Sequence, residues 1–185
     1  MTATVGGKGK LRVGIIGVGR LGRVYARDIA SRIPRATLAA VADTNAAVAQ
    51  EVAEEWGVPR WYPEAEGLLA DRDVDAVVIV SNTHTHRPLA IAALASGKPT
   101  FCEKPPALSL AETAAIEKEV ERAGVFFQMG FMRRFDAGYR VDLVAIERAL
   151  TPRTKLIILT SPHNPTGVTT DADTLRGLAA LARGA

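Results

Sequence analysis

Short apolar runs alternate with longer amphipathic stretches along the chain. Several of the runs are nearly continuous Val, Ile, Ala and Leu, which is typical of strands buried on both faces of a parallel sheet. The expected strands are Leu11–Gly17, Thr37–Asp43, Arg60–Tyr62, Ala76–Ser81, Thr100–Glu103, Val125–Gly130 and Lys155–Thr160. The expected helices are Arg20–Arg32, Asn45–Trp56, Pro63–Leu69, His86–Ser96, Ser109–Ala123, Asp136–Leu150 and Asp171–Arg183. This alternation predicts an α/β fold with a doubly wound parallel sheet, a Rossmann-like three-layer sandwich.

Composition and charge narrow the class of protein. Of 185 residues, 48% are hydrophobic and 23% are charged, which is ordinary for a globular domain. The net charge is only +3 and the basic residues are scattered, so neither a nucleic-acid surface nor a membrane surface is expected. The polar segment Met1–Lys10 lacks the apolar run of a secretory signal, and the longest apolar stretch, Ala76–Val80, has the length of a strand. The single cysteine, Cys102, excludes an internal disulfide framework, and these features together favour a cytoplasmic protein.

A glycine motif joins the first strand to the first helix. It reads Gly17-Val-Gly19-Arg20-Leu21-Gly22. In such motifs the first glycine permits a tight turn, the second allows a pyrophosphate to approach the backbone, and the third allows the helix to pack closely on the strand. The helix that begins at Arg20 and Leu21 presents free N–H groups and a partial positive charge to the phosphates. The residues of this motif that are predicted to bind a dinucleotide are Gly17, Gly19, Arg20, Leu21 and Gly22.

An acidic residue at the end of the second strand supports the same prediction. Asp43 follows Gly22 by 21 residues, which is the spacing expected of a residue that binds the adenosine ribose. A carboxylate there accepts hydrogen bonds from the ribose hydroxyls and repels a 2′-phosphate, so NAD is expected in preference to NADP. The alternative is a glycine-rich turn with an unrelated surface aspartate, and the strand–turn–helix–strand context argues against it.

Four further motifs follow in order and point to one family. They are Ser81–His86, Gly97–Pro99, Glu103–Pro105 and Gly130–Asp136. Together with the glycine motif they resemble the glucose-fructose oxidoreductase/inositol dehydrogenase (Gfo/Idh/MocA) family, and the inositol 2-dehydrogenases most closely. The resemblance covers about residues 10–140 and implies an NAD(P)-binding Rossmann domain over residues 1–140.

The resemblance also implies roles for particular residues. The loop with Ser81, Asn82 and His84 would line the adenine and nicotinamide-ribose side of the cleft. Glu103 would adjoin the cofactor. Lys104 would lie beside the nicotinamide and the reacting hydroxyl, where it hydrogen-bonds the substrate and eases removal of its proton.

Two other residue types receive a structural interpretation. His84 and His86 lie two positions apart and would not face the same side of a helix, so no metal site is expected. For His86, a capping or packing role is at least as well supported as a catalytic one. Cys102 is interpreted as a small buried strand residue and not as a nucleophile.

The C-terminal part resembles a different family. The run Val141–Gly167, with Asn164-Pro-Thr-Gly, looks like class I/II aminotransferases of fold type I. The Schiff-base lysine segment, the aspartate for the pyridine nitrogen and the phosphate loop of those enzymes do not occur here, so pyridoxal phosphate is not expected. Asn164 is then a turn residue. The chain is therefore interpreted as a chimera with a junction near Arg140–Val141, most simply a deliberate recombination, with natural fusion or a truncated gene as alternatives.

Residues 141–185 are then expected to form an α-β-α extension on the same sheet. One helix, Asp136–Leu150, would bridge the junction, and Lys155–Thr160 would lie parallel to Val125–Gly130. Asp171–Arg183 would pack across this added strand, so that both parts form a single domain. The alternative is exchange of this strand and helix between two chains, so a monomer or a strand-exchanged homodimer is predicted.

Three functions remain open from the sequence. Members of the resembled family continue into a larger C-terminal substrate domain, and the roughly 45 residues after Tyr139 are too few for one. The favoured function is therefore a dinucleotide-binding domain derived from a polyol or sugar dehydrogenase, with little or no turnover. The alternatives are an active NAD-dependent oxidoreductase on an inositol-like or sugar hydroxyl, and a structural chimera that has lost ligand binding.

Overall fold

A computed structural model of the protein describes residues 9–131, 141–151, 154 and 170–184. The chain divides into two compact units, Met1–Gly130 and Phe131–Ala185. Within the described ranges, no helix is long and apolar enough to cross a membrane.

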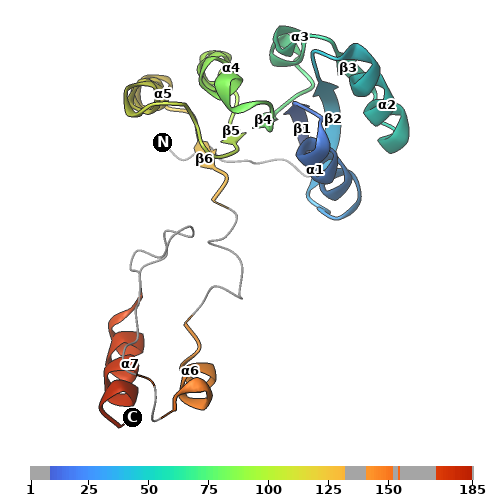
Figure 1. Ribbon diagram of the computed structural model, residues 1–185. Helices are drawn as coiled ribbons and strands as arrows, with labels where there is room; N and C mark the ends of the chain where they lie inside the picture. The colour runs from blue at the N-terminus through green and yellow to red at the C-terminus, as the bar shows by residue number, and fades with distance from the viewer. Residues whose placement is uncertain (1–8, 132–140, 152–153, 155–169, 185) are drawn as a thin grey trace. The chain divides into compact units, whose positions relative to one another are not determined.

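The first unit contains a six-stranded sheet whose strands are all parallel (Figure 1). The strands are β1 Leu11–Ile16, β2 Ala36–Ala42, β3 Arg60–Tyr62, β4 Ala76–Ile79, β5 Thr100–Cys102 and β6 Phe127–Met129. Their order in the sheet is β3-β2-β1-β4-β5-β6, so the direction of winding reverses between β1 and β4. The predicted doubly wound, Rossmann-like sheet is confirmed, and open sheets of this type bind ligands at the carboxyl ends of the strands beside this reversal.

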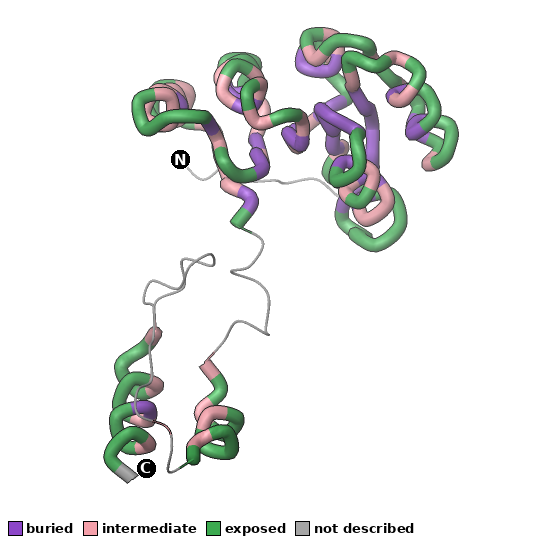
Figure 2. Tube along the Cα trace, in the orientation of Figure 1, coloured by how far each residue is buried: buried purple, intermediate pink, exposed green. Residues whose placement is uncertain are grey.

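Five helices cover the two faces of this sheet (Figure 1). They are α1 Arg20–Ser31, α2 Ala46–Trp56, α3 Ala65–Ala70, α4 Thr83–Ala95 and α5 Leu110–Ala123. Two separate apolar clusters form the core: one includes buried residues of α1 and α2, and the other includes buried residues of α3, α4 and α5. Burial is concentrated in the strands and on the inner sides of these helices (Figure 2).

Strand register brings the ends of the central strands to one edge. Ile16, the last residue of β1, is aligned with Ala42 of β2 on one side and with Ile79 of β4 on the other. The segments that follow these three strands therefore lie next to one another, although they are far apart in the sequence.

Helix α4 begins earlier than the sequence predicts. Thr83 is its first residue, whereas the expected start is His86. Asn82 has extended backbone angles and occupies the N-cap position, so the predicted loop Ser81–His84 is two residues shorter and His84 lies in the first helical turn. The polar sequence Thr-His-Thr carries no apolar periodicity, which is why the pattern places the start of the helix too late.

The second unit contains α6 Leu143–Ala149 and α7 Ala172–Gly184. Asp142 is extended and its carboxylate accepts a hydrogen bond of 3.0 Å from the Ala145 N–H, so it caps α6. The predicted continuous helix Asp136–Leu150 is therefore wrong at Val141 and Asp142, which precede the first helical residue, and residues 136–140 lie outside the described ranges. The predicted strand Lys155–Thr160 and the Asn164 turn lie outside the described residues, and their docking, or exchange between chains, stays a prediction.

Candidate dinucleotide-binding site

Close backbone packing shapes the loop between β1 and α1. Gly17 has a φ of 91°, and a Cβ added to it would lie 2.6 Å from the backbone N and Cα of Ser81. A Cβ on Gly22 would lie 2.0 Å from the carbonyl oxygen of Gly17. A Cβ on Gly19, in contrast, would meet no atom within 4 Å. The first and third glycines are thus required by the fold, whereas the second faces open space, as expected where a pyrophosphate approaches.

The Asp43 carboxylate lies between this loop and α2. One oxygen accepts a hydrogen bond of 2.9 Å from the Val18 N–H, and the other accepts one of 2.9 Å from the Asn45 N–H. A carboxylate has about four acceptor positions, so further donors such as ribose hydroxyls can still bind. Asp43 therefore both fixes the glycine loop and remains available to a ligand.

A pocket of about 410 Å³ opens where these segments meet. The predicted cofactor residues that line it are Gly17, Gly19, Arg20, Leu21, Asp43, Ser81 and Asn82. Gly22 does not line the pocket but supports the glycine loop, because it packs closely against the carbonyl group of Gly17. The glycine loop, the end of β2 and the end of β4 thus form one cavity, as the sequence predicts.

The structure adds lining residues that the sequence analysis missed. From the segment after β3 come Glu64, Ala65 and Glu66, and from one face of α4 come Thr85, Pro88 and Leu89. Both groups follow from rules that the sequence could have supplied. The carboxyl ends of parallel strands share an edge, and residues at i, i+3 and i+4 share a helix face once the helix start is correctly placed.

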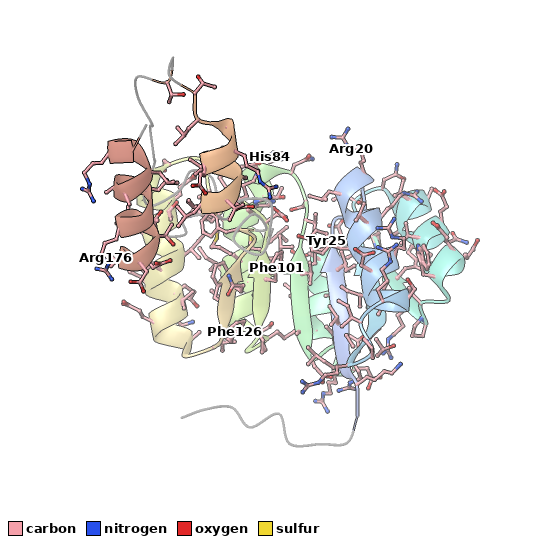
Figure 3. All side chains as sticks on the ribbon, turned by 90° about the horizontal axis from the view of Figure 1, so that it is seen from below. Arg20, Tyr25, His84, Phe101, Phe126 and Arg176 are labelled. Carbon is pink, nitrogen blue, oxygen red and sulfur yellow. The ribbon has the colours of Figure 1, made fainter. Side chains whose placement is uncertain are left out.

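Besides Gly22, three predicted residues do not line this pocket. His84 is exposed in the first turn of α4, at the same edge of the sheet as Arg20 (Figure 3). Lys104 is exposed, and its ammonium has no hydrogen bond or ion pair with the part of the chain that the structure describes. Glu103 is only 4% exposed. His84 follows β4, Glu103 and Lys104 follow β5, and none of the three is among the lining residues of the pocket.

The Glu103 carboxylate is held by two donors. The Tyr25 hydroxyl donates to one oxygen at 2.5 Å, and the Lys104 N–H donates to the other at 3.1 Å. The Tyr25 ring, on α1, packs against Phe101 with ring centroids 5.7 Å apart (Figure 3). Burial, and then the hydrogen bond to Glu103, raise the pKa of the Tyr25 hydroxyl well above its usual value, so it stays protonated as a donor at neutral pH.

His86 is buried, as the packing interpretation expects. Its Nδ1 lies 2.7 Å from the carbonyl oxygen of Pro105, and its Nε2 lies 2.9 Å from that of Ser81. The described residues contain no group of three or more His, Cys, Asp or Glu side chains that could hold a metal ion. Cys102 is fully buried, and burial followed by the charge of Glu103 raises the pKa of its thiol to about 12. Such a thiol is not a nucleophile at neutral pH.

Comparison with known proteins identifies similar chains. Residues 11–131 match the sequence model of a protein family, GFO_IDH_MocA, which is described as an oxidoreductase family with an NAD-binding Rossmann fold. The scyllo-inositol 2-dehydrogenase (NAD(+)) of Bacillus subtilis is 41% identical over 130 residues, which are 70% of this chain and 38% of that protein. The myo-inositol 2-dehydrogenase of Thermotoga maritima is 35% identical over 151 residues, which are 82% of this chain and 45% of that protein.

A solved structure gives the same result in three dimensions. The scyllo-inositol dehydrogenase of Lactobacillus casei, crystallised with NAD(H) and scyllo-inositol, has a TM-score of 0.69 and 33% identity. The match covers 76% of this chain and 42% of that one. The chain therefore spans less than half the length of these relatives. The Thermotoga maritima match, at 82% of the chain, must extend past Arg140 and so crosses the predicted junction.

Two glycine variants should separate support of the fold from contact with a ligand. Gly22→Ala places a methyl group against the Gly17 carbonyl, so we expect a loss of about 1–3 kcal/mol in the free energy of unfolding and weaker dinucleotide binding. Gly19→Ala meets no protein atom, so it should unfold like the unchanged protein in denaturant yet bind dinucleotide more weakly. Equal unfolding midpoints for all three proteins would contradict this assignment.

Proposed function

Because the chain belongs to the Gfo/Idh/MocA oxidoreductase family, with its NAD-binding Rossmann fold, we propose that it is the cofactor-binding part of a dehydrogenase acting on an inositol-like or sugar hydroxyl. NAD, the cofactor predicted from the glycine motif and Asp43, is confirmed by this membership. The observation that carries the proposal is that the glycine loop, Asp43 and Ser81 line a single pocket.

The residues present fit NAD. The N–H groups at the start of α1 suit the pyrophosphate, and Gly19 leaves room for its approach. Asp43 suits the ribose hydroxyls because it retains free acceptor positions. When bound, NAD supplies the acceptor for the hydride that leaves the substrate carbon.

Charge around the pocket favours NAD over NADP. Its lining carries three carboxylates, on Asp43, Glu64 and Glu66, and one guanidinium, on Arg20. A 2′-phosphate would add about two negative charges to this acidic wall, and the residue that follows Asp43 is Thr44, which offers no positive charge.

Lys104 is the residue proposed to handle the substrate proton. Its ammonium is exposed at the carboxyl edge of the sheet, just after β5. In its unprotonated amine form, a lysine at this position can accept a hydrogen bond from the reacting hydroxyl and then take up its proton while hydride leaves the carbon. This assignment comes from the Glu103-Lys104-Pro105 motif and from the position of the motif in the fold.

The remaining proposals concern the chain as a whole. We infer that a polypeptide of these 185 residues binds NAD with little or no turnover, and an active dehydrogenase is the alternative. The cytoplasmic location, the aminotransferase-like origin of residues 141–185 and the chimeric junction also stay predictions. The Thermotoga maritima match, which extends past Arg140, argues against a junction at Arg140–Val141.

The first prediction concerns cofactor choice. The unchanged protein should bind NAD more tightly than NADP, and Asp43→Ser should weaken NAD binding and reduce the discrimination between the two. The reason is that serine removes the charge that repels the phosphate, together with one ribose acceptor. Calorimetric titration of both proteins with both cofactors measures this, and equal affinities in the unchanged protein would refute the prediction.

The second prediction concerns catalysis. Reduction of NAD by myo-inositol should be absent or very slow in this polypeptide, because positioning of the reactants contributes about 7–11 kcal/mol to such reactions. The 185 residues match 38% and 45% of the lengths of these two relatives, so most residues of each relative have no counterpart in this polypeptide that could position a substrate. Formation of NADH, followed by absorbance, tests this. Rapid and saturable turnover that is lost in Lys104→Met would establish the active dehydrogenase instead.

A further inference from the structure

Both residues that flank Lys104 are held by hydrogen bonds from other elements. Glu103, on its N-terminal side, is bound by Tyr25 of α1. Pro105, on its C-terminal side, is bound through its carbonyl oxygen by His86 of α4. Lys104 itself is exposed, and its side chain has no partner within the described residues. The position of Lys104 therefore depends on contacts made by its neighbours.

The Tyr25 contact joins Lys104 to the phosphate-binding helix. Tyr25 lies one turn after Gly22, near the start of α1, and donates to Glu103 at 2.5 Å. The second Glu103 oxygen accepts the Lys104 N–H, so one carboxylate connects α1 to the backbone of Lys104. Glu103 is 4% exposed, and a Cβ on Gly130 would lie 3.0 Å from its carboxyl carbon. Each oxygen thus accepts one hydrogen bond from the protein, and the burial of the side chain limits access of a ligand to the remaining acceptor positions.

The His86 contact joins Lys104 to the wall of the cofactor pocket. His86 is 2% exposed, and its Nδ1 and Nε2 lie within hydrogen-bond distance of the carbonyl oxygens of Pro105 and Ser81. Since both partners only accept, each contact is a hydrogen bond where that ring nitrogen carries a hydrogen. Ser81 lines the pocket and packs against Gly17. The imidazole therefore connects the segment after Lys104 to the segment after β4, on which the glycine loop rests.

We propose that Tyr25 and His86 are positioning residues that hold Lys104 in a fixed place relative to the bound dinucleotide, without contacting it themselves. This inference rests on the proposed function, since it assumes that NAD occupies the pocket and that Lys104 lies beside its nicotinamide. It also changes the role expected for Glu103, which connects Tyr25 to Lys104 and is not a cofactor ligand.

Hydrogen bonds to charged or buried groups are strong enough for this role. Loss of a hydrogen bond to a buried carboxylate changes an equilibrium by roughly tenfold or more. Tyr25→Phe removes only the hydroxyl and keeps the ring that packs on Phe101. His86→Gln keeps a polar side chain that cannot bridge the two carbonyl oxygens in the same way. Each variant should therefore release one side of the Lys104 segment.

The test follows the chemical reactivity of Lys104. The full 185-residue protein is treated with an amine-acylating reagent over a range of pH, with and without saturating NAD, and acylation of Lys104 is quantified by peptide mass spectrometry. Lys118, exposed on α5, serves as the reference for reagent dose. Calorimetry fixes the NAD concentration so that every variant is equally occupied, and circular dichroism confirms that each is folded.

We expect NAD to slow acylation of Lys104 in the unchanged protein by about tenfold, and by only about twofold in Tyr25→Phe and His86→Gln. The pH profile of Lys104 acylation in the presence of NAD should shift in both variants. The matched control is Tyr62→Phe, which removes a tyrosine hydroxyl bound at 3.1 Å to the carboxylate of Asp71, away from Lys104. This control should behave like the unchanged protein.

The outcomes separate the inference from the function on which it rests. Full protection of Lys104 in the unchanged protein and undiminished protection in both variants would overturn the positioning role alone. Absence of protection in the unchanged protein, despite bound NAD, would overturn the placement of Lys104 and the positioning role with it. If His86→Gln does not fold, Tyr25→Phe alone tests the positioning role, because this substitution removes only the hydroxyl group and keeps the ring.

Discussion

The close approach of the Gly17 backbone to Ser81 is the constraint on which the rest of the site depends. A side chain on Gly17 would lie 2.6 Å from the Ser81 backbone, so only glycine allows the turn after β1 to rest on the segment after β4. Gly22 extends the same constraint, because α1 packs directly on the Gly17 carbonyl. With the loop in this position, α1 begins at the carboxyl edge of the sheet and its N-terminus faces the pocket.

Three sets of hydrogen bonds connect the glycine loop and α1 to the segments that follow the neighbouring strands. Asp43 ties the glycine loop to the end of β2, Tyr25 ties α1 to the segment after β5, and His86 ties that segment back to Ser81. The contacts form a closed path around the carboxyl ends of the central strands. The Asp43–Val18 and Tyr25–Glu103 contacts join residues that are 25 and 78 positions apart, so the site exists only when the whole sheet is assembled.

Much of the fold follows from local pattern, but the contacts within the site do not. The glycine motif and Asp43 are predictable because a strand, a turn, a helix and a second strand follow at fixed spacing. Glu64 and Glu66 reach the pocket only because β3 lies beside β2 in the sheet, which is a matter of strand order. The Tyr25–Glu103 pair spans 78 positions, and no periodicity links them. The sequence predicts that His84 and His86 do not face the same side of a helix, and with α4 starting at Thr83 the first is exposed and the second is buried.

The most direct test of the central claim is a calorimetric titration of this polypeptide with NAD, repeated in the presence of ADP. ADP carries the adenosine and the pyrophosphate without the nicotinamide half, so it should compete for the glycine loop and Asp43. The account predicts saturable binding of one NAD per chain that ADP displaces. Absence of saturable binding, or binding that ADP leaves unchanged, would contradict the assignment of this pocket to the dinucleotide.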